Sequence, residues 1–244
     1  MLPKMGLTPD AAPSLAALAA CLDRLLLADR FRGEEDPAGV YRPSARPVRT
    51  VGLLLDPWDG LPRWIAAEGI DALVVHRPWC LPLAELGDVG VLAYHLAFDE
   101  WLTLGKNPDL AAALGMTDLA VLGFKAGRPL GMLGSVPEQP ATAVVDRLDR
   151  LFGGLEATVE GTHAVISRVA VVGAMTDALV REAVDRGADL YVTGQLRVPA
   201  RAAVAETGLT VVAVGHGRSE VWGLRALGDA LRARWASLRV VLAP

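Results

Sequence analysis

The fold is decided by residues 169–215, which read VAVVGAMTDALVREAVDRGADLYVTGQLRVPARAAVAETGLTVVAVG. Three aliphatic runs in this stretch have the length of strands buried on both faces: Val169–Gly173, Leu190–Thr193 and Val211–Gly215. Between them lie two segments of helical length, Asp177–Gly187 and Val198–Gly208. Strands that alternate with helices pair in parallel through right-handed crossovers, so this stretch predicts an α/β protein.

Similar elements flank this stretch. Downstream, the sequence predicts a helix at Val221–Trp235 and a short strand at Val240–Leu242. Upstream, the glycine-rich segment Leu119–Val136 predicts a hairpin-like β segment, followed by a helix at Ala141–Leu151. The remaining predicted elements are a helix at Ser14–Phe31, a loop at Arg32–Arg46 and strands at Val48–Leu55, Ala72–Val75 and Val89–Tyr94. We expect residues 1–244 to form a single α/β domain of two related α/β lobes, 1–120 and 121–244, with mostly parallel strands, forming one compact unit.

The composition narrows the classes of function. Of the 244 residues, 52% are hydrophobic and 21% are charged, as in a globular protein. The net charge of −4 disfavours a general binder of nucleic-acid backbones, although the arginines of Arg197–Arg201 and Arg225–Arg234 leave a local basic groove open. Two distant cysteines indicate a reducing compartment. Met1–Asp10 lacks the apolar run of a signal peptide and no stretch has the length of a membrane span, so we expect a cytoplasmic protein without a membrane partner.

Three of the four histidines follow predicted strands. His76 comes directly after Ala72–Val75, and His95 comes after Val89–Tyr94, with Asp99 four residues later. His216 follows the strand that ends at Gly215. In open α/β sheets, ligands bind beyond the carboxyl ends of the strands. We therefore expect these three stretches to converge on one crevice.

His216 and Glu220 are four residues apart at a predicted helix start, which places both side chains on one face. An imidazole with a carboxylate suits a divalent metal such as Zn²⁺, Mn²⁺, Fe²⁺ or Ni²⁺. The alternative is structural: His216 as a polar residue at the helix start and Glu220 as a solvated acid of the first turn.

Other polar residues also have structural interpretations. Asp99 alone is typical of a helix cap, and His163 is typical of the surface. Cys80 could join a metal site, but a lone buried cysteine is the simpler interpretation. The glycines form neither a phosphate loop nor a dinucleotide fingerprint, and a Gly-x-Ser-x-Gly elbow is missing.

Four ordered motifs carry a resemblance to a known family: Val75-His76-Arg77-Pro78, His95-Leu96-Ala97-Phe98-Asp99, Thr193-Gly194-Gln195 and Gly215-His216-Gly217-Arg218-Ser219-Glu220. From about Val48 onward the chain resembles the toroidal, dinuclear-metal family named after the yeast NGG-one interacting factor three. Its bacterial members are labelled GTP cyclohydrolase I type 2 homologues. The chain is similar to the compact form without an inserted domain.

The resemblance implies a set of metal ligands. Carried over by position, it assigns His76, Asp99, His216 and Glu220 to one or two divalent metals. The chain departs from the family pattern at Arg77, where a second histidine is expected, and at Gln195, where a glutamate is usual. Because a guanidinium cannot ligate a metal, we expect at most one tightly held ion per chain.

The resemblance also implies a function. One hypothesis is a metal-dependent hydrolase that acts on a nucleotide or a related small molecule, with His95 as general acid/base or as hydrogen-bonding support of Asp99. The second is a metal-binding scaffold or regulator without turnover, which Arg77 and Gln195 favour. The third is a ring that associates with nucleic acid. We expect a homo-oligomer, a hexameric ring, from the resemblance and the apolar composition.

Overall fold

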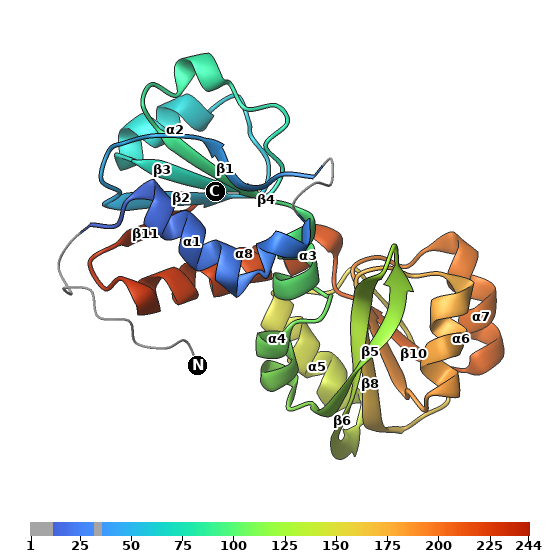
Figure 1. The fold of residues 1–244 in the computed structure, drawn as a ribbon. Helices are drawn as coiled ribbons and strands as arrows, with labels where there is room; N and C mark the ends of the chain where they lie inside the picture. Colours follow the sequence, from blue (N-terminus) through green and yellow to red (C-terminus); the bar gives the residue numbers. More distant parts are fainter. Residues whose placement is uncertain (1–11, 32–35) are drawn as a thin grey trace. The chain divides into compact units, whose positions relative to one another are not determined.

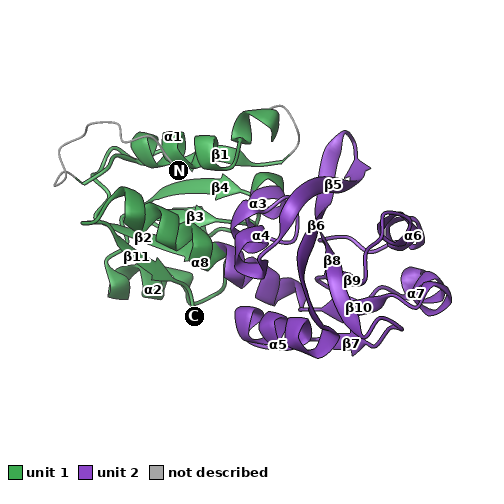
Figure 2. Cartoon of the chain, turned by 90° about the horizontal axis from the view of Figure 1, so that it is seen from below, with its two compact units in different colours: residues 1–97, 224–244 green, residues 98–223 purple. Residues whose placement is uncertain are grey.

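The computed structural model describes residues 12–31 and 36–244. The prediction about Met1–Asp10 and the first part of the predicted loop at Arg32–Arg46 lie outside the described residues. The chain divides into two compact units, shown in green and purple in Figure 2: residues 1–97 with 224–244, and residues 98–223. The division falls inside two helices, α3 (Leu96–Leu102) and α8 (His216–Arg234).

Unit 1 is built on a five-stranded sheet in the order β1-β4-β3-β2-β11. Its strands are β1 (Ala38–Arg42), β2 (Thr50–Leu54), β3 (Ala72–Val75), β4 (Gly90–Tyr94) and β11 (Arg239–Leu242). Its helices are α1 (Leu15–Leu25), α2 (Leu61–Glu68) and the 3-10 turns η1 (Ala28–Phe31) and η2 (Leu83–Glu85). The neighbours β4, β3, β2 and β11 are parallel, and β1 pairs antiparallel with β4.

Both faces of the central strands of unit 1 are covered, which explains why β2, β3 and β4 are buried throughout. A Cβ at Gly52 would lie 2.8 Å from Trp64 of α2, so this face packs on α2. A Cβ at Gly90, on the opposite face, would lie 2.8 Å from Leu15 of α1. Helix α8 lies on the same face as α1, because Gly228 approaches Leu53 (Figure 1). Apolar burial on two faces is the main stabilising contribution to such a sheet.

Unit 2 is built on a six-stranded sheet in the order β5-β6-β8-β9-β10-β7. Its strands are β5 (Thr117–Lys125), β6 (Arg128–Pro140), β7 (Ala157–Val159), β8 (Val165–Val172), β9 (Leu190–Thr193) and β10 (Thr210–Ala213). Its helices are α4 (Pro108–Leu114), α5 (Ala141–Phe152), α6 (Asp177–Asp185), α7 (Arg201–Thr207) and the 3-10 turn η3 (Val198–Ala200). β8, β9 and β10 are parallel, and the other pairings are antiparallel.

Strand β8 shows how unit 2 forms its core. Val169 and Val171 belong to the cluster that includes α4 and α5. Ala170 and Val172 belong to the cluster that includes α6 and α7. Alternate side chains of a strand point to opposite faces, so a continuous aliphatic run is the expected sequence for a strand covered by helices on both sides. Figure 1 shows the two helix pairs on the two faces of this sheet.

The predicted fold class is confirmed: the chain is an α/β protein with two sheets and, among the described residues, five of nine strand pairings are parallel. The hairpin-like segment is confirmed as β5 and β6. The predicted division into lobes at 1–120 and 121–244 follows chain order, whereas the two units do not, because β11 returns to β2. The single domain stays a prediction. Among the described residues, none of the helices is long and apolar enough to cross a bilayer.

The predicted loop at Arg32–Arg46 is wrong where β1 forms. Gly39 and the prolines around it favoured a loop, but Ala38–Arg42 pairs antiparallel with β4. Its register shifts between Val40 and Arg42, so the strand is irregular, and it lies at the edge of the sheet. An edge strand tolerates glycine, nearby proline and an irregular register, which is why its sequence lacks the pattern of the buried strands.

Candidate metal site

The carboxyl ends of β3 and β4 lie side by side because the two strands are parallel neighbours. His76 directly follows β3 and His95 directly follows β4. The two imidazole rings are 4.9 Å apart between centroids. The predicted convergence at a strand edge is therefore confirmed for these two histidines.

Asp99 joins the two histidines. One potential ligand atom from each of His76, His95 and Asp99 lies within 4.8 Å of the others. Asp99 is in the first turn of α3, which begins directly after His95. One helical turn therefore brings the His-x-x-x-Asp residues together. We call His76, His95 and Asp99 the donor cluster.

His76 is held in a defined orientation. The residue is 2% exposed, and its Nδ1 lies 3.2 Å from the backbone oxygen of Tyr94. A carbonyl oxygen only accepts hydrogen bonds, so Nδ1 carries the proton and donates it. In the neutral ring, the lone pair then lies on Nε2. This arrangement is typical of metal-binding histidines, whose second nitrogen donates to a backbone carbonyl or a carboxylate.

His95 is held by Asp36, a residue that the sequence did not identify. Nδ1 of His95 donates to Oδ1 of Asp36 over 2.6 Å, and the backbone nitrogen of Leu96 donates to Oδ2 over 2.9 Å. Asp36 reaches this position because β1 runs antiparallel to β4, with Ala38 opposite Tyr94. The start of β1 thus lies at the edge where β4 ends. To predict this contact from the sequence, both the strand β1 and its antiparallel pairing with β4 would have to be recognised.

Arg77, next to His76, is paired with Asp56. Its Nε and Nη2 each lie 2.7 Å from a different carboxylate oxygen of Asp56, in the bidentate geometry favoured by guanidinium. Asp56 follows β2, the parallel neighbour of β3, so strand pairing brings the two together. The positive charge of Arg77, which is next to His76 in the sequence, is therefore offset by a carboxylate.

His216 and Glu220 form a second pair, in unit 2. Their Nε2 and Oε1 atoms are 3.1 Å apart, which confirms the predicted placement on one helix face. The side chain of His216 is 64% exposed and that of Glu220 only 2%. The structural alternative, in which Glu220 is a solvated acid of the first turn, is therefore wrong for Glu220. Gly215, at φ +96°, turns the chain from β10 into α8, a conformation that favours glycine.

The Thr-Gly-Gln motif lies beside His216. A Cβ at Gly194 would be 3.5 Å from Cα of His216, and the amide of Gly215 donates to the carbonyl of Gly194. The hydroxyl of Thr193 is buried and has no hydrogen-bond partner among the residues that the structure describes. The side chain of Gln195, where the resemblance expected a glutamate, is exposed. Whether His216 and Glu220 complete the site of the donor cluster stays a prediction.

The structure also places Cys80 and His163, the two other residues considered in the sequence. Cys80 is exposed, so the prediction of a buried cysteine is wrong, and it is outside the donor cluster. Cys80 lies in a turn that follows β3, outside the core. His163 is at the surface as predicted, with Nδ1 3.7 Å from Asp189.

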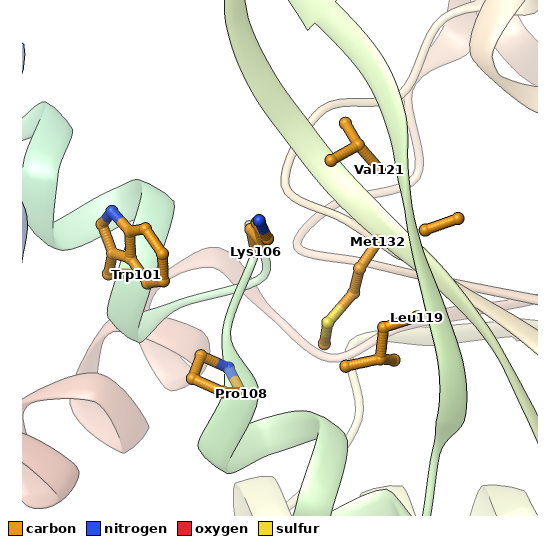
Figure 3. A pocket seen from close by; sticks show the side chains of 7 residues that line it. Trp101, Lys106, Pro108, Leu119, Val121 and Met132 are labelled. Atoms are coloured by element: carbon orange, nitrogen blue, oxygen red, sulfur yellow. The ribbon is translucent and has the colours of Figure 1, made fainter. Parts of the chain in front are cut away.

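Unit 2 also contains a cavity of about 120 Å³. In Figure 3, Trp101, Lys106 and Pro108 line one side, and Leu119, Val121 and Met132 of the hairpin line the other. The ammonium group of Lys106 lies 5.8 Å from the centroid of the Trp101 ring, a cation–π contact. The lining is apolar apart from Lys106, so this cavity offers none of the ligands that the donor cluster provides.

The fold and the donor cluster define the class: a mixed α/β protein of two sheets with imidazole and carboxylate donors at a strand edge. A family model described as Duf34/NIF3 (NGG1p interacting factor 3) matches residues 80–243. This match covers more than half of the chain. The chain belongs to the Duf34/NIF3 family, which confirms the resemblance seen in the sequence.

Individual proteins agree with this assignment. A protein of Deinococcus radiodurans named GTP cyclohydrolase 1 type 2 homolog is 30% identical over 177 residues, 66% of this chain and 67% of that protein. One of the same name from Pseudomonas aeruginosa is 32% identical over 151 residues, 61% of this chain and 59% of its own length. The crystal structure of TTHA1606 from Thermus thermophilus has a TM-score of 0.74 and 27% identity, and the match covers 95% of this chain and 98% of that one.

Proposed function

We propose that the chain is a divalent-metal-binding protein whose donor cluster holds a metal ion that supports hydrolysis of a nucleotide or a related small molecule. The observation that carries this proposal is the approach of three donor atoms within 4.8 Å. Two imidazoles and a carboxylate suit Zn²⁺, Mn²⁺, Fe²⁺ or Ni²⁺. The name of the relatives makes GTP the first substrate to test.

The residues present fit such a metal ion. His76 donates through Nδ1 to a backbone carbonyl, which leaves Nε2 with the lone pair that a metal requires. Asp99 supplies a hard anionic oxygen, and it lies on a helix turn fixed by the backbone. Arg77 is paired with Asp56, so a carboxylate offsets the nearest fixed positive charge in the sequence motif.

A metal bound here would lower the pKa of a coordinated water and polarise the substrate. The chain itself would bind and orient the reactants. His76 is buried and rigid, whereas Trp79 is 55% exposed and packs edge-on against His95, with centroids 5.0 Å apart. An exposed aromatic side chain beside the donor cluster suits stacking with a planar purine ring. This contact supports a nucleotide as the substrate class.

The second candidate function is a metal-binding scaffold or regulator without turnover. Two departures from the family pattern favour it: Arg77 replaces an expected imidazole, and Gln195 replaces an expected carboxylate. A single metal can organise a site but lacks the second ion that could stabilise both attacking and leaving oxygens. A homo-oligomeric ring stays a prediction for either function, as does the participation of His216 and Glu220.

The test is metal binding followed by a substrate screen. We expect the chain purified without chelator to contain a divalent metal by elemental analysis. His76→Ala should lower the metal content strongly, because it removes a buried, oriented ligand. His163→Ala is the matched control, since it removes an exposed histidine that also lies near an aspartate. Metal content of His76→Ala equal to that of the control would contradict the proposed site.

Turnover separates the two candidate functions. The metal-loaded chain is incubated with GTP, other nucleotides and phosphoesters, and products are separated by chromatography. Product that forms with the unmodified chain and not with His76→Ala supports the hydrolase. Full metal occupancy without any product across the screen favours the scaffold.

A further inference from the structure

Asp36 makes two hydrogen bonds at the donor cluster. Its Oδ1 accepts from Nδ1 of His95 over 2.6 Å, and its Oδ2 accepts from the backbone nitrogen of Leu96 over 2.9 Å. The side chain of Asp36 is only 10% exposed. One carboxylate therefore fixes both the ring of His95 and the backbone beside it, in a partly desolvated position where such bonds are strong.

The hydrogen bond between His95 and Asp36 determines the tautomer of His95. A carboxylate accepts hydrogen bonds, so Nδ1 carries the proton and Nε2 carries the lone pair of the neutral ring. His76 reaches the same state through the carbonyl of Tyr94. The two imidazoles, whose centroids are 4.9 Å apart, therefore have the same tautomer, with the proton on Nδ1 and the lone pair on Nε2.

The position that the family pattern assigns to a second imidazole is occupied by Arg77. Its guanidinium is held by Asp56 in a bidentate pair at the end of β2. The backbone nitrogen of Arg77 donates to the carbonyl of Leu55, which fixes this residue on the neighbouring strand end. The chain therefore provides one imidazole at this motif, and the other imidazole of the donor cluster is that of His95, directly after β4.

We propose that His95, positioned by Asp36, is a metal ligand that replaces the imidazole missing at position 77. This inference rests on the metal-binding function proposed above and assigns the ligand set of that site. His95 then binds through Nε2 and is not a general acid/base, because its two nitrogens are occupied by the metal and by Asp36. Asp36 is a positioning residue that acts through His95.

The test is titration with Co²⁺, whose visible spectrum reports the number and type of ligands. The unmodified chain is compared with His95→Ala, Asp36→Ala and Asp36→Asn. We expect Asp36→Ala to weaken Co²⁺ binding about 10- to 100-fold, the usual effect of removing a partner of a metal-binding histidine. His95→Ala should weaken binding further. Both variants should change the spectrum, whereas Asp36→Asn should be intermediate because the amide oxygen still accepts from Nδ1.

Two controls separate positioning from a structural role. His163→Ala and Asp229→Ala remove an exposed histidine and an exposed aspartate and should leave the Co²⁺ spectrum unchanged. Thermal unfolding of the metal-free variants identifies any that are unfolded, and Asp36→Asn keeps the shape of the side chain.

A His95→Ala variant that is folded and keeps the unmodified spectrum and affinity, while His76→Ala loses them, overturns this inference but not the proposal that the chain binds a metal through His76. A chain that binds no Co²⁺ overturns the proposed function as well. A changed spectrum in His95→Ala with an unchanged one in Asp36→Ala overturns the role of Asp36.

Discussion

The two sheets each place a histidine at the carboxyl edge of parallel strands, but they do so differently. In unit 1, three segments distant in sequence contribute to one edge: Asp36 before β1, His76 after β3 and His95 after β4. In unit 2, the contacting pair of His216 and Glu220 comes from one turn of one helix. The first arrangement depends on strand pairing, and the second on helical periodicity alone.

This difference affects how rigid the donors are. His76 is 2% exposed and anchored to a carbonyl, and Asp36 anchors His95. The side chain of His216 is 64% exposed, although its partner Glu220 is buried. Preorganised ligands bind a metal with little loss of side-chain freedom, whereas an exposed imidazole must be ordered on binding. We therefore expect the edge of unit 1 to contribute more to metal affinity.

The strongest test of this comparison concerns the pair in unit 2. If His216 and Glu220 are ligands, as the family pattern implies, His216→Ala and Glu220→Gln should each lower metal occupancy with the fold retained. Gln preserves the shape of the buried Glu220 side chain, so the substitution leaves no cavity that would destabilise the fold. Elemental analysis measures occupancy, and Glu206→Gln, at a side chain 61% exposed, is the control. Full occupancy in both variants would restrict the metal ligands to the donor cluster.

A smaller effect is expected at Arg77. The unmodified chain should hold at most one tightly bound metal, because a guanidinium stands where a second imidazole is expected. Arg77→His should raise the number of bound ions towards two per chain. Arg77→Ala is the matched control, because it also releases Asp56 but supplies no ligand. Two ions per unmodified chain by elemental analysis would contradict this prediction.

The smallest expected effect is on the free energy of unfolding, and it concerns two buried tyrosines, one in each sheet. The hydroxyl of Tyr94 on β4 donates to Oδ1 of Asp23 over 2.8 Å, and that of Tyr191 on β9 donates to the carbonyl of Ala174 over 2.8 Å. A hydrogen bond to a charged group contributes about 1.5–3 kcal/mol and one to a neutral group about 0.5–1.5 kcal/mol. Tyr94→Phe should therefore lower the free energy of unfolding more than Tyr191→Phe, as measured by denaturant titration. The reverse order would show that the charge of Asp23 adds nothing.

Tyr191 also makes the stability of the fold depend on pH. Burial, reinforced by Glu182, raises the pKa of Tyr191 above its ordinary value of 10.0. Above that pH the unfolded chain releases the phenolic proton while the folded chain keeps it, so stability falls as pH rises. Tyr191→Phe should make this fall shallower. An unchanged slope above pH 10 would contradict the prediction.

The sequence predicted the fold well where burial is complete. Ala72–Val75 and Leu190–Thr193 were predicted with the bounds of β3 and β9, because strands covered on both faces are aliphatic without interruption. The edge strand β1 was missed, since solvent on one side permits polar residues, glycine and an irregular register. The return of β11 to β2 has no local signature in the sequence, so the division into units could not be derived from it.

The candidate site was predictable to a similar degree. His76, His95 and Asp99 were found because they follow strands or are one helical turn apart. Asp36 and Asp56 were not, since their contacts depend on which strands are neighbours. Asp36 lies in an acidic run, which is usually a solvated surface. Only the antiparallel pairing of β1 with β4 places its carboxylate against an imidazole.

Strand β11 affects the order of events during synthesis. It forms an edge of the first sheet, yet residues 55–238 separate it from its partner β2. Unit 2 is continuous, so all its strands leave the ribosome before β11 does. Until then β2 presents unpaired backbone groups, a template for wrong pairing with other chains. Because domains generally fold as units during synthesis, we expect unit 2 to be complete before the first sheet gains β11.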